Sequence, residues 1–246
     1  MKKIVLLLAF CLSIGNLFAQ DVDANKLCTE GDAAMKAKNY AEALTKYSEY
    51  LKLTNYEDAD RVFNCGYAAF NAKKYDDAVK FYDMAIQKGK NVDNAYVGKA
   101  MSLRDQDKAA EFTSTVEAGL KVNPNNQNLE KLLYGYCMKK GQAAQKAGKI
   151  NDAEELFKDV LVVANKTYKG NALYSLGAMY YNEGAKILTA ATPLATTDAD
   201  KYNAEKDKAD VQMKKAKDYL NQAIALNPAD EKCKKILASI DETLKQ

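Results

Sequence analysis

Histidine is absent from this chain of 246 residues. Its absence removes the usual proton shuttle, the Ser/His and Cys/His nucleophile pairs and the most common metal ligand. The chain also lacks a glycine-rich phosphate loop of the GxxxxGK(S/T) or GxGxxG kind, and it contains no CxxC pair. Nucleotide binding and a zinc site therefore have little support. We expect no catalytic residue, no cofactor and no metal site, and hence no enzyme.

Catalysis by carboxylates alone is the one chemistry that composition leaves open. Glu183 lies beside Tyr180 and Tyr181, and Asp105 is followed closely by Asp107, so either group contains a candidate acid and base. Solvated helix ends and faces usually account for such side chains. A carboxylate-only envelope hydrolase is therefore kept as a remote alternative.

Proline and glycine are scarce, with 3 and 12 residues, whereas Ala, Lys, Leu and Glu are abundant. This composition favours helix over nearly the whole chain. The net charge is only +3, and no basic run carries interleaved aromatic residues. We therefore expect no nucleic-acid partner.

Only the N-terminus contains a long apolar run. A pair of lysines precedes apolar residues 4–12, and Ala19 supplies a small residue at a suitable cleavage point. This arrangement is typical of a secretory signal peptide over residues 1–19. No later stretch reaches the length that a membrane span needs. We expect an exported chain, residues 20–246, that is periplasmic or secreted.

Four cysteines follow the expected cleavage point: Cys28, Cys65, Cys137 and Cys233. Export permits disulfides, but these cysteines are widely separated and each lies in a helical pattern, where cysteine serves as a small apolar residue. We expect four unpaired core thiols. Cys28 with Cys65 is the pair that stays open to bridging, because both lie near the middle of the first helix of adjacent repeats.

A fixed spacing of glycine, aromatic and alanine residues occurs twice in the first ninety residues. The first copy consists of Gly31, Tyr40, Ala43, Tyr47 and Tyr50, and the second of Gly66, Tyr75, Ala78, Tyr82 and Ala85. The two glycines lie 35 residues apart. That period is typical of stacked two-helix units, which usually present an extended surface to a partner.

The spacing resembles that of the tetratricopeptide repeat, which has a small residue at position 8, aromatics at 17 and 24, and Ala at 20 and 27. The resemblance implies an all-α, right-handed α-solenoid of about five helical hairpins. We expect repeats at about 24–57, 59–92, 93–126, 128–166 and 170–228, and a polar capping helix within 229–246.

Three of the repeats depart from the pattern. The third has Phe112 where Ala is expected and Val116 where an aromatic is expected. The fourth begins near Asn128, about two turns early. The fifth contains an insert of roughly 27 residues, which continues helical spacing and predicts a protruding hairpin at about 186–212.

The resemblance also implies a concave groove lined by the first helix of each repeat. Its central members form an apolar, partly aromatic strip with polar neighbours, a composition suited to binding a peptide or helix. Each aromatic could instead pack between repeats. The partner-binding candidates are Phe63, Tyr67, Phe70, Asn71, Val97, Met101, Arg104, Met138, Gln142, Tyr174 and Tyr181.

The carboxylate clamp of chaperone-docking members does not match this chain. The corresponding positions hold Cys28, Asp32, Asn64, Asn94 and Gly98, of which only Asn64 agrees with the family. Asp32 would repel a carboxylate. Any ligand must therefore be held in another way.

We expect a non-catalytic scaffold that binds another envelope or secreted protein in the groove. The alternative is a structural component that self-associates, or docks on an outer-membrane complex, through the fifth-repeat hairpin. In that alternative Tyr202 and Met213 are expected to be exposed.

Overall fold

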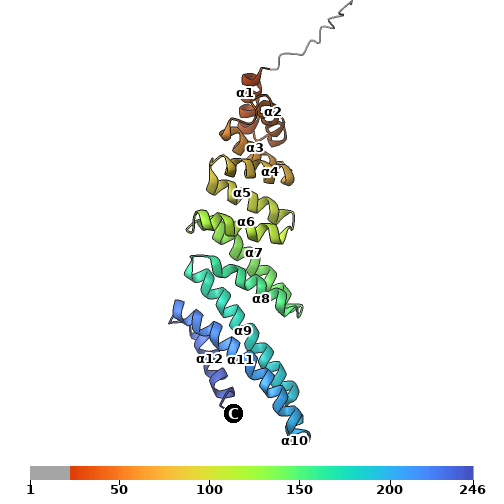
Figure 1. Cartoon of the computed structure of the whole chain (residues 1–246), viewed down its shortest axis with the longest axis vertical. Helices are drawn as coiled ribbons and strands as arrows, with labels where there is room; N and C mark the ends of the chain where they lie inside the picture. The colour runs from red at the N-terminus through yellow and green to blue at the C-terminus, as the bar shows by residue number, and fades with distance from the viewer. Residues whose placement is uncertain (1–22, 246) are drawn as a thin grey trace, which may run out of the picture.

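The computed structural model describes residues 23–245, and the expected signal peptide lies outside these residues. The described residues form helices joined by short turns, with no strand among them. Successive helices pack as antiparallel neighbours and stack into an elongated array, with α1 at one end and the α9–α12 group at the other (Figure 1). The predicted all-α solenoid is confirmed.

The helices are introduced here in chain order. The first eight are α1 (Ala24–Lys36), α2 (Tyr40–Leu53), α3 (Ala59–Asn71), α4 (Tyr75–Gln87), α5 (Val92–Asp105), α6 (Ala109–Val122), α7 (Gln127–Lys146) and α8 (Ile150–Asp159). They are followed by a 3-10 turn η1 (Val160–Val162), α9 (Lys166–Ala191), α10 (Leu194–Thr197), α11 (Ala199–Leu226) and α12 (Glu231–Thr243).

The turn between the two helices of a hairpin has the same structure four times. In the first hairpin, Lys38 is left-handed with φ 59°, and the N–H of Asn39 donates to the carbonyl of Ala34 at 2.8 Å. This is a Schellman ending, which satisfies the last carbonyls of a helix and reverses the chain. The equivalent left-handed residues are Lys73, Asp107 and Gly148, each two positions before the next helix.

Close contact between paired helices explains the glycine-to-aromatic spacing. A Cβ added at Gly31 would lie 2.6 Å from the ring of Tyr47, so only glycine lets this ring lie against α1. These residues are 16 positions apart. In the last hairpin Gly177 makes the same approach to Leu220, 43 positions away. The 27 additional residues between these two positions lengthen α9 and α11 and form the connection between them.

The third hairpin compensates for its departures from the pattern. Ala100 occupies the small position of α5, and its partner position on α6 is Val116 rather than a bulky aromatic. The lost volume returns one turn earlier, where Phe112 is fully buried and packs against Tyr136 of α7 with ring centroids 4.7 Å apart. Exchange of a large and a small residue thus preserves core filling.

The fourth hairpin has a first helix of 20 residues, longer than the 13 or 14 residues of α1, α3 and α5. The additional N-terminal turns carry Glu130, whose carboxylate is buried. It accepts backbone N–H groups of Ala164 and Asn165, at 2.5 and 2.9 Å, just before α9. These bonds satisfy a buried charge and hold α7 to the start of the last repeat.

Helices α9 and α11 pack together along their length and extend past α12, with α10 at their tip (Figure 1). The expected exposure of Met213 in this hairpin is wrong. Its side chain is 1% exposed, because Gly184 lets α11 approach α9 and the Met213 side chain fills the contact. Tyr202 is half-buried. The solenoid is closed by α12, which buries Cys233 and Ile240 and pairs Asp241 with Lys217 of α11 at 2.6 Å.

The four cysteines among residues 23–245 are free. Cys65, Cys137 and Cys233 are core residues, and burial raises the pKa of their thiols to about 12, 12 and 11. Cys28 differs from the expectation because it is only half-buried. It accepts a bond from Nε of Arg61 at 3.1 Å, whereas Cys65 lies 3.5 Å from the Ser48 hydroxyl.

Candidate partner-binding groove

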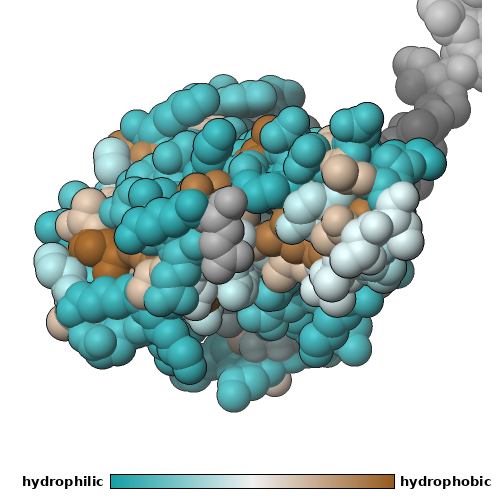
Figure 2. All heavy atoms as spheres, turned by 90° about the horizontal axis from the view of Figure 1, so that it is seen from below, coloured by the Kyte–Doolittle hydropathy of each residue, from teal (hydrophilic) through white to brown (hydrophobic). Residues whose placement is uncertain are grey.

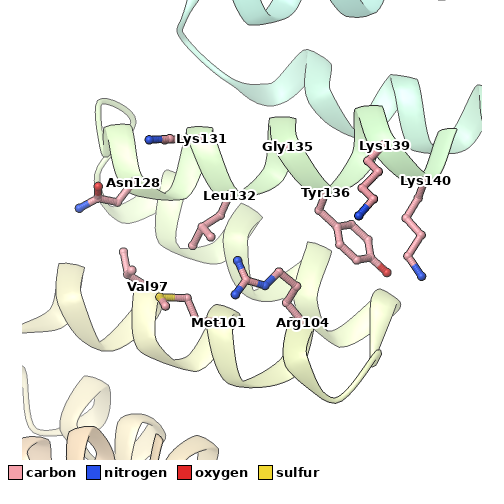
Figure 3. Close-up of a pocket in the computed structure, with 10 residues that line it drawn as sticks. All are labelled: Val97, Met101, Arg104, Asn128, Lys131, Leu132, Gly135, Tyr136, Lys139 and Lys140. Atoms are coloured by element: carbon pink, nitrogen blue, oxygen red, sulfur yellow. The ribbon is translucent and has the colours of Figure 1, made fainter. Parts of the chain in front are cut away.

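A cavity of about 490 Å³ opens between α5 and α7. Val97, Met101 and Arg104 line it from α5, and their side chains point toward α7 (Figure 3). The opposite wall is α7, from which Leu132, Tyr136 and Lys139 extend into the space. Two first helices of successive repeats therefore enclose an open groove.

The α7 wall consists of two parallel rows of side chains. One row is Asn128, Leu132, Tyr136 and Lys140, and the other is Lys131, Gly135 and Lys139. Residues four apart lie above one another on a helix, so both rows belong to one face. The early start of α7 supplies Asn128, Lys131 and Leu132, so the lengthened helix produces three of the seven residues of this wall.

The interior of the groove is apolar. Val97 and Leu132 pack against the neighbouring core, whereas Met101 is half-buried and makes no such packing contact. An unbranched, polarizable thioether adapts to ligands of different shape. Gly135 adds open space, because a Cβ placed there meets no atom within 4 Å.

The edge of the groove is basic. Four of the ten lining residues are cationic and none is acidic. Arg104 is paired with its neighbour Asp105 at 2.8 Å, and Lys140 with Asp107 at 2.9 Å. Among residues 23–245, Lys131 and Lys139 have no carboxylate within 4.0 Å. The groove therefore presents two uncompensated positive charges.

Tyr136 links the groove to the core. Its ring packs on Phe112, and the Lys140 ammonium lies 5.7 Å from the ring centroid. Desolvation raises the pKa of Tyr136, which the nearby Lys140 partly opposes. The hydroxyl is therefore neutral at physiological pH and available as a hydrogen-bond partner.

The sequence candidates fall in three places. Val97, Met101 and Arg104 line the groove together. On α3, Tyr67 is 44% exposed, whereas Phe63 and Phe70 are half-buried and contact Tyr82 and Tyr75. These two rings thus pack partly against α4, the second helix of their own hairpin. The side-chain amide of Asn71 donates to the carbonyl of Tyr67.

The remaining candidates do not extend the groove into a continuous strip. Met138 is 9% exposed and belongs to the core, so its side chain faces away from the groove surface. Gln142 is exposed on α7, and Tyr174 and Tyr181 are half-buried on α9 against the same core. None of these four lines the α5–α7 cavity.

Sequence reasoning missed Lys131, Leu132, Tyr136 and Lys139. The family register selects Gly135, Met138 and Gln142 on this helix, and of these three residues Gly135 alone lines the cavity. The signal was available in the four-residue spacing of the two rows. The repeat pattern does not include this spacing, because the extra N-terminal turns of α7 lie outside it.

The carboxylates considered for catalysis are paired with cations. Asp105 and Asp107 contact Arg104 and Lys140, and Glu183 contacts Lys186 at 2.7 Å. Within residues 23–245, no group of three or more Cys, Asp or Glu side chains is arranged to hold a metal ion. No helix of this part of the chain has both the length and the apolarity to cross a bilayer.

Comparison with known proteins defines the family. The sequence profile of the tetratricopeptide repeat (TPR) matches residues 28–93. The crystal structure of a TPR repeats protein from Bacteroides fragilis NCTC 9343 shares 46% sequence identity, with a TM-score of 0.83, over 89% of this chain and 98% of that chain. This chain belongs to the tetratricopeptide repeat family.

More distant TPR structures also align. The C-terminal part of a TPR repeat-containing protein from Cytophaga hutchinsonii is 13% identical over 85% of this chain and 98% of that chain, with a TM-score of 0.34. No curated protein matches the chain. TPR repeats generally mediate protein–protein interaction, and the TPR fold is typically non-catalytic.

Proposed function

We propose that this TPR protein is a non-catalytic scaffold that binds a segment of a partner protein in the α5–α7 groove. The observation that carries the proposal is the cavity of about 490 Å³ with an apolar floor and a polar edge. Volumes of this order accommodate a few side chains of a ligand. Burial of apolar side chains against Val97, Met101 and Leu132 would supply most of the affinity, and polar contacts would set the register.

The groove is a better candidate than the α9–α11 hairpin. In the hairpin Met213 is buried, and the face of the molecule at that end shows only small, separated hydrophobic areas among hydrophilic residues (Figure 2). Stable self-association needs a larger apolar surface. The α5–α7 groove, by contrast, brings the apolar side chains of Val97, Met101 and Leu132 together.

An exported location is part of the proposal. Its support is the sequence alone: the lysine pair, the apolar run over residues 4–12 and the small residue Ala19 have the order of a secretory signal. The partner would then be another envelope or secreted protein.

A steric block of the groove tests the proposal. In Gly135→Leu the new Cβ would meet no atom within 4 Å and the longer side chain would occupy the groove, and the loss of a mid-helix glycine favours the fold by about 0.5–1 kcal/mol. We expect partners cross-linked to the wild-type protein in intact cells to be lost with this variant.

Gly170→Leu is the matched control, because it also replaces a helical glycine with open space around it, on α9 and outside the groove. It should retain every partner. Equal recovery of all partners by both folded variants would refute binding in the groove.

A further inference from the structure

We propose that the segment bound in the α5–α7 groove is an extended acidic peptide, with two carboxylates that flank an apolar side chain. This inference rests on the proposed function, and it specifies the chemistry of the partner. The main support for this inference is the pair of positive charges on the α7 wall, Lys131 and Lys139.

Lys131 and Lys139 are exposed charges that a ligand could pair with. The other two cations of the groove are neutralised by Asp105 and Asp107, which lie where α5 ends and in the turn that follows. Lys131 and Lys139 have no such acid among the described residues. A ligand carboxylate at each would complement this charge and disfavour basic competitors.

The spacing of these two lysines determines the spacing of the carboxylates. They lie eight residues apart on one row of α7, which is about 12 Å along the helix axis. Residues four apart in an extended segment point to the same side and are about 13 Å apart. An acidic residue at each of two such positions therefore reaches both lysines.

The middle of the row suits the backbone of the ligand. Gly135 lies halfway between the two lysines, and a Cβ there would meet no atom within 4 Å. The absence of a side chain lets a peptide backbone approach α7, while the side chain between the two acids turns toward Met101 and Leu132. The apolar floor and the charged edge thus favour one peptide pattern. It has two acidic residues separated by three residues, at least one of which is apolar.

Nucleic acid fits the groove less well, although it is also anionic. Single-stranded nucleic acid needs aromatic faces on which bases stack. The single aromatic side chain of the lining is Tyr136, and its ring packs on Phe112. The other floor residues are aliphatic or thioether side chains, which suit apolar amino acids.

The experiment is a selection of random 12-residue peptides displayed on phage against the purified chain. We expect enriched sequences with two Asp or Glu residues four apart around an apolar residue. Fluorescence anisotropy of the corresponding synthetic peptides should show binding that weakens about ten-fold or more in the double variant Lys131→Glu/Lys139→Glu. A peptide with both acids replaced by lysine should bind that variant better than the wild type.

The control double variant is Lys232→Glu/Lys235→Glu on α12, which changes the net charge equally on exposed residues far from the groove. It should leave peptide binding unchanged. Enrichment of neutral or basic peptides that Gly135→Leu displaces would overturn the acidic pattern and leave groove binding intact. If no enriched peptide loses its binding in Gly135→Leu, the result would contradict both proposals. Tighter binding of a 12-nucleotide single-stranded DNA, lost in Lys131→Glu/Lys139→Glu, would also overturn the peptide assignment.

Discussion

Asp159, the last residue of α8, is half-buried among groups that disfavour its charge. Desolvation is the largest effect, and Glu117 of α6 and Glu155 of α8 add repulsion, so that the pKa of Asp159 rises to about 6. Cys137 of α7 also faces this carboxyl. The end of α8 disfavours negative charge further, because the helix dipole is negative there.

The raised pKa makes the contribution of Asp159 to stability depend on pH. In the unfolded chain the carboxyl loses its proton near pH 3.8, whereas the folded protein retains it up to about pH 6. The folded state therefore binds more protons in this window, and stability falls as pH rises through it. Above pH 6 the folded protein contains an unfavourable carboxylate.

Replacement of Asp159 by Asn should remove this cost. With allowance for solvent screening, we expect Asp159→Asn to stabilise the fold by roughly 1 kcal/mol at pH 8, or about 2–4 °C in Tm, and to have little effect at pH 4. Thermal unfolding followed by circular dichroism at both pH values measures the difference. Asp218→Asn, at an exposed position of α11, serves as the control. A gain that is the same at both pH values would contradict the assignment to Asp159.

At the scale of secondary-structure elements, the turns between paired helices contain backbone strain. Lys38, Lys73 and Asp107 adopt the left-handed conformation with φ of 57–59°, where a Cβ is unfavourable, and only the fourth hairpin has a glycine, Gly148, at this position. The Schellman bonds hold these residues in place. The sequences of the first three turns are therefore not optimal for their geometry.

Exchange of residues at these positions tests the interpretation. Lys73→Gly should stabilise the protein by about 0.5–1 kcal/mol, and Gly148→Ala should destabilise it by about 1 kcal/mol. Lys74→Gly is the control, since Lys74 has an ordinary φ of −91°. Urea unfolding monitored by circular dichroism gives the three free energies. Destabilisation by Lys73→Gly beyond that of Lys74→Gly would show that the lysine side chain itself supports the turn.

The same elements show what the sequence could and could not predict. The 16-residue separation of Gly31 and Tyr47 reflects a direct contact between paired helices, so its recurrence predicts the hairpins. The longer separation of Gly177 and Leu220 likewise indicates the insert in the last hairpin. The groove depends instead on how α7 is rotated and how far it extends toward α5. Neither property follows from the period of the repeat, and the family register therefore selected Met138, which is in the core.

At the scale of the whole molecule, the core of residues 23–245 is divided into two clusters. One joins α1–α4 to Ala95 at the start of α5, and the other extends from Ala100 of α5 to Ile240 of α12. The boundary lies within a single helix, beside the α5–α7 groove. In a solenoid each repeat contacts only its neighbours, so stability is the sum of local units and their interfaces.

A cavity in one cluster should therefore act locally. Leu133 of α7 and Leu51 of α2 are fully buried, one in each cluster, and truncation of either to Ala should cost about 2–5 kcal/mol. We expect Leu133→Ala to accelerate amide hydrogen exchange in α7–α9 and to leave α1 and α2 unchanged, because local opening of one unit need not open the other. Leu51→Ala should produce the reverse pattern, with faster exchange in α1–α3 and an unchanged exchange rate in α9–α12. Hydrogen exchange resolved by mass spectrometry measures both patterns. Equal acceleration along the chain in both variants would show that the two clusters unfold as one cooperative unit. The groove would then not lie at a boundary between two units of different stability.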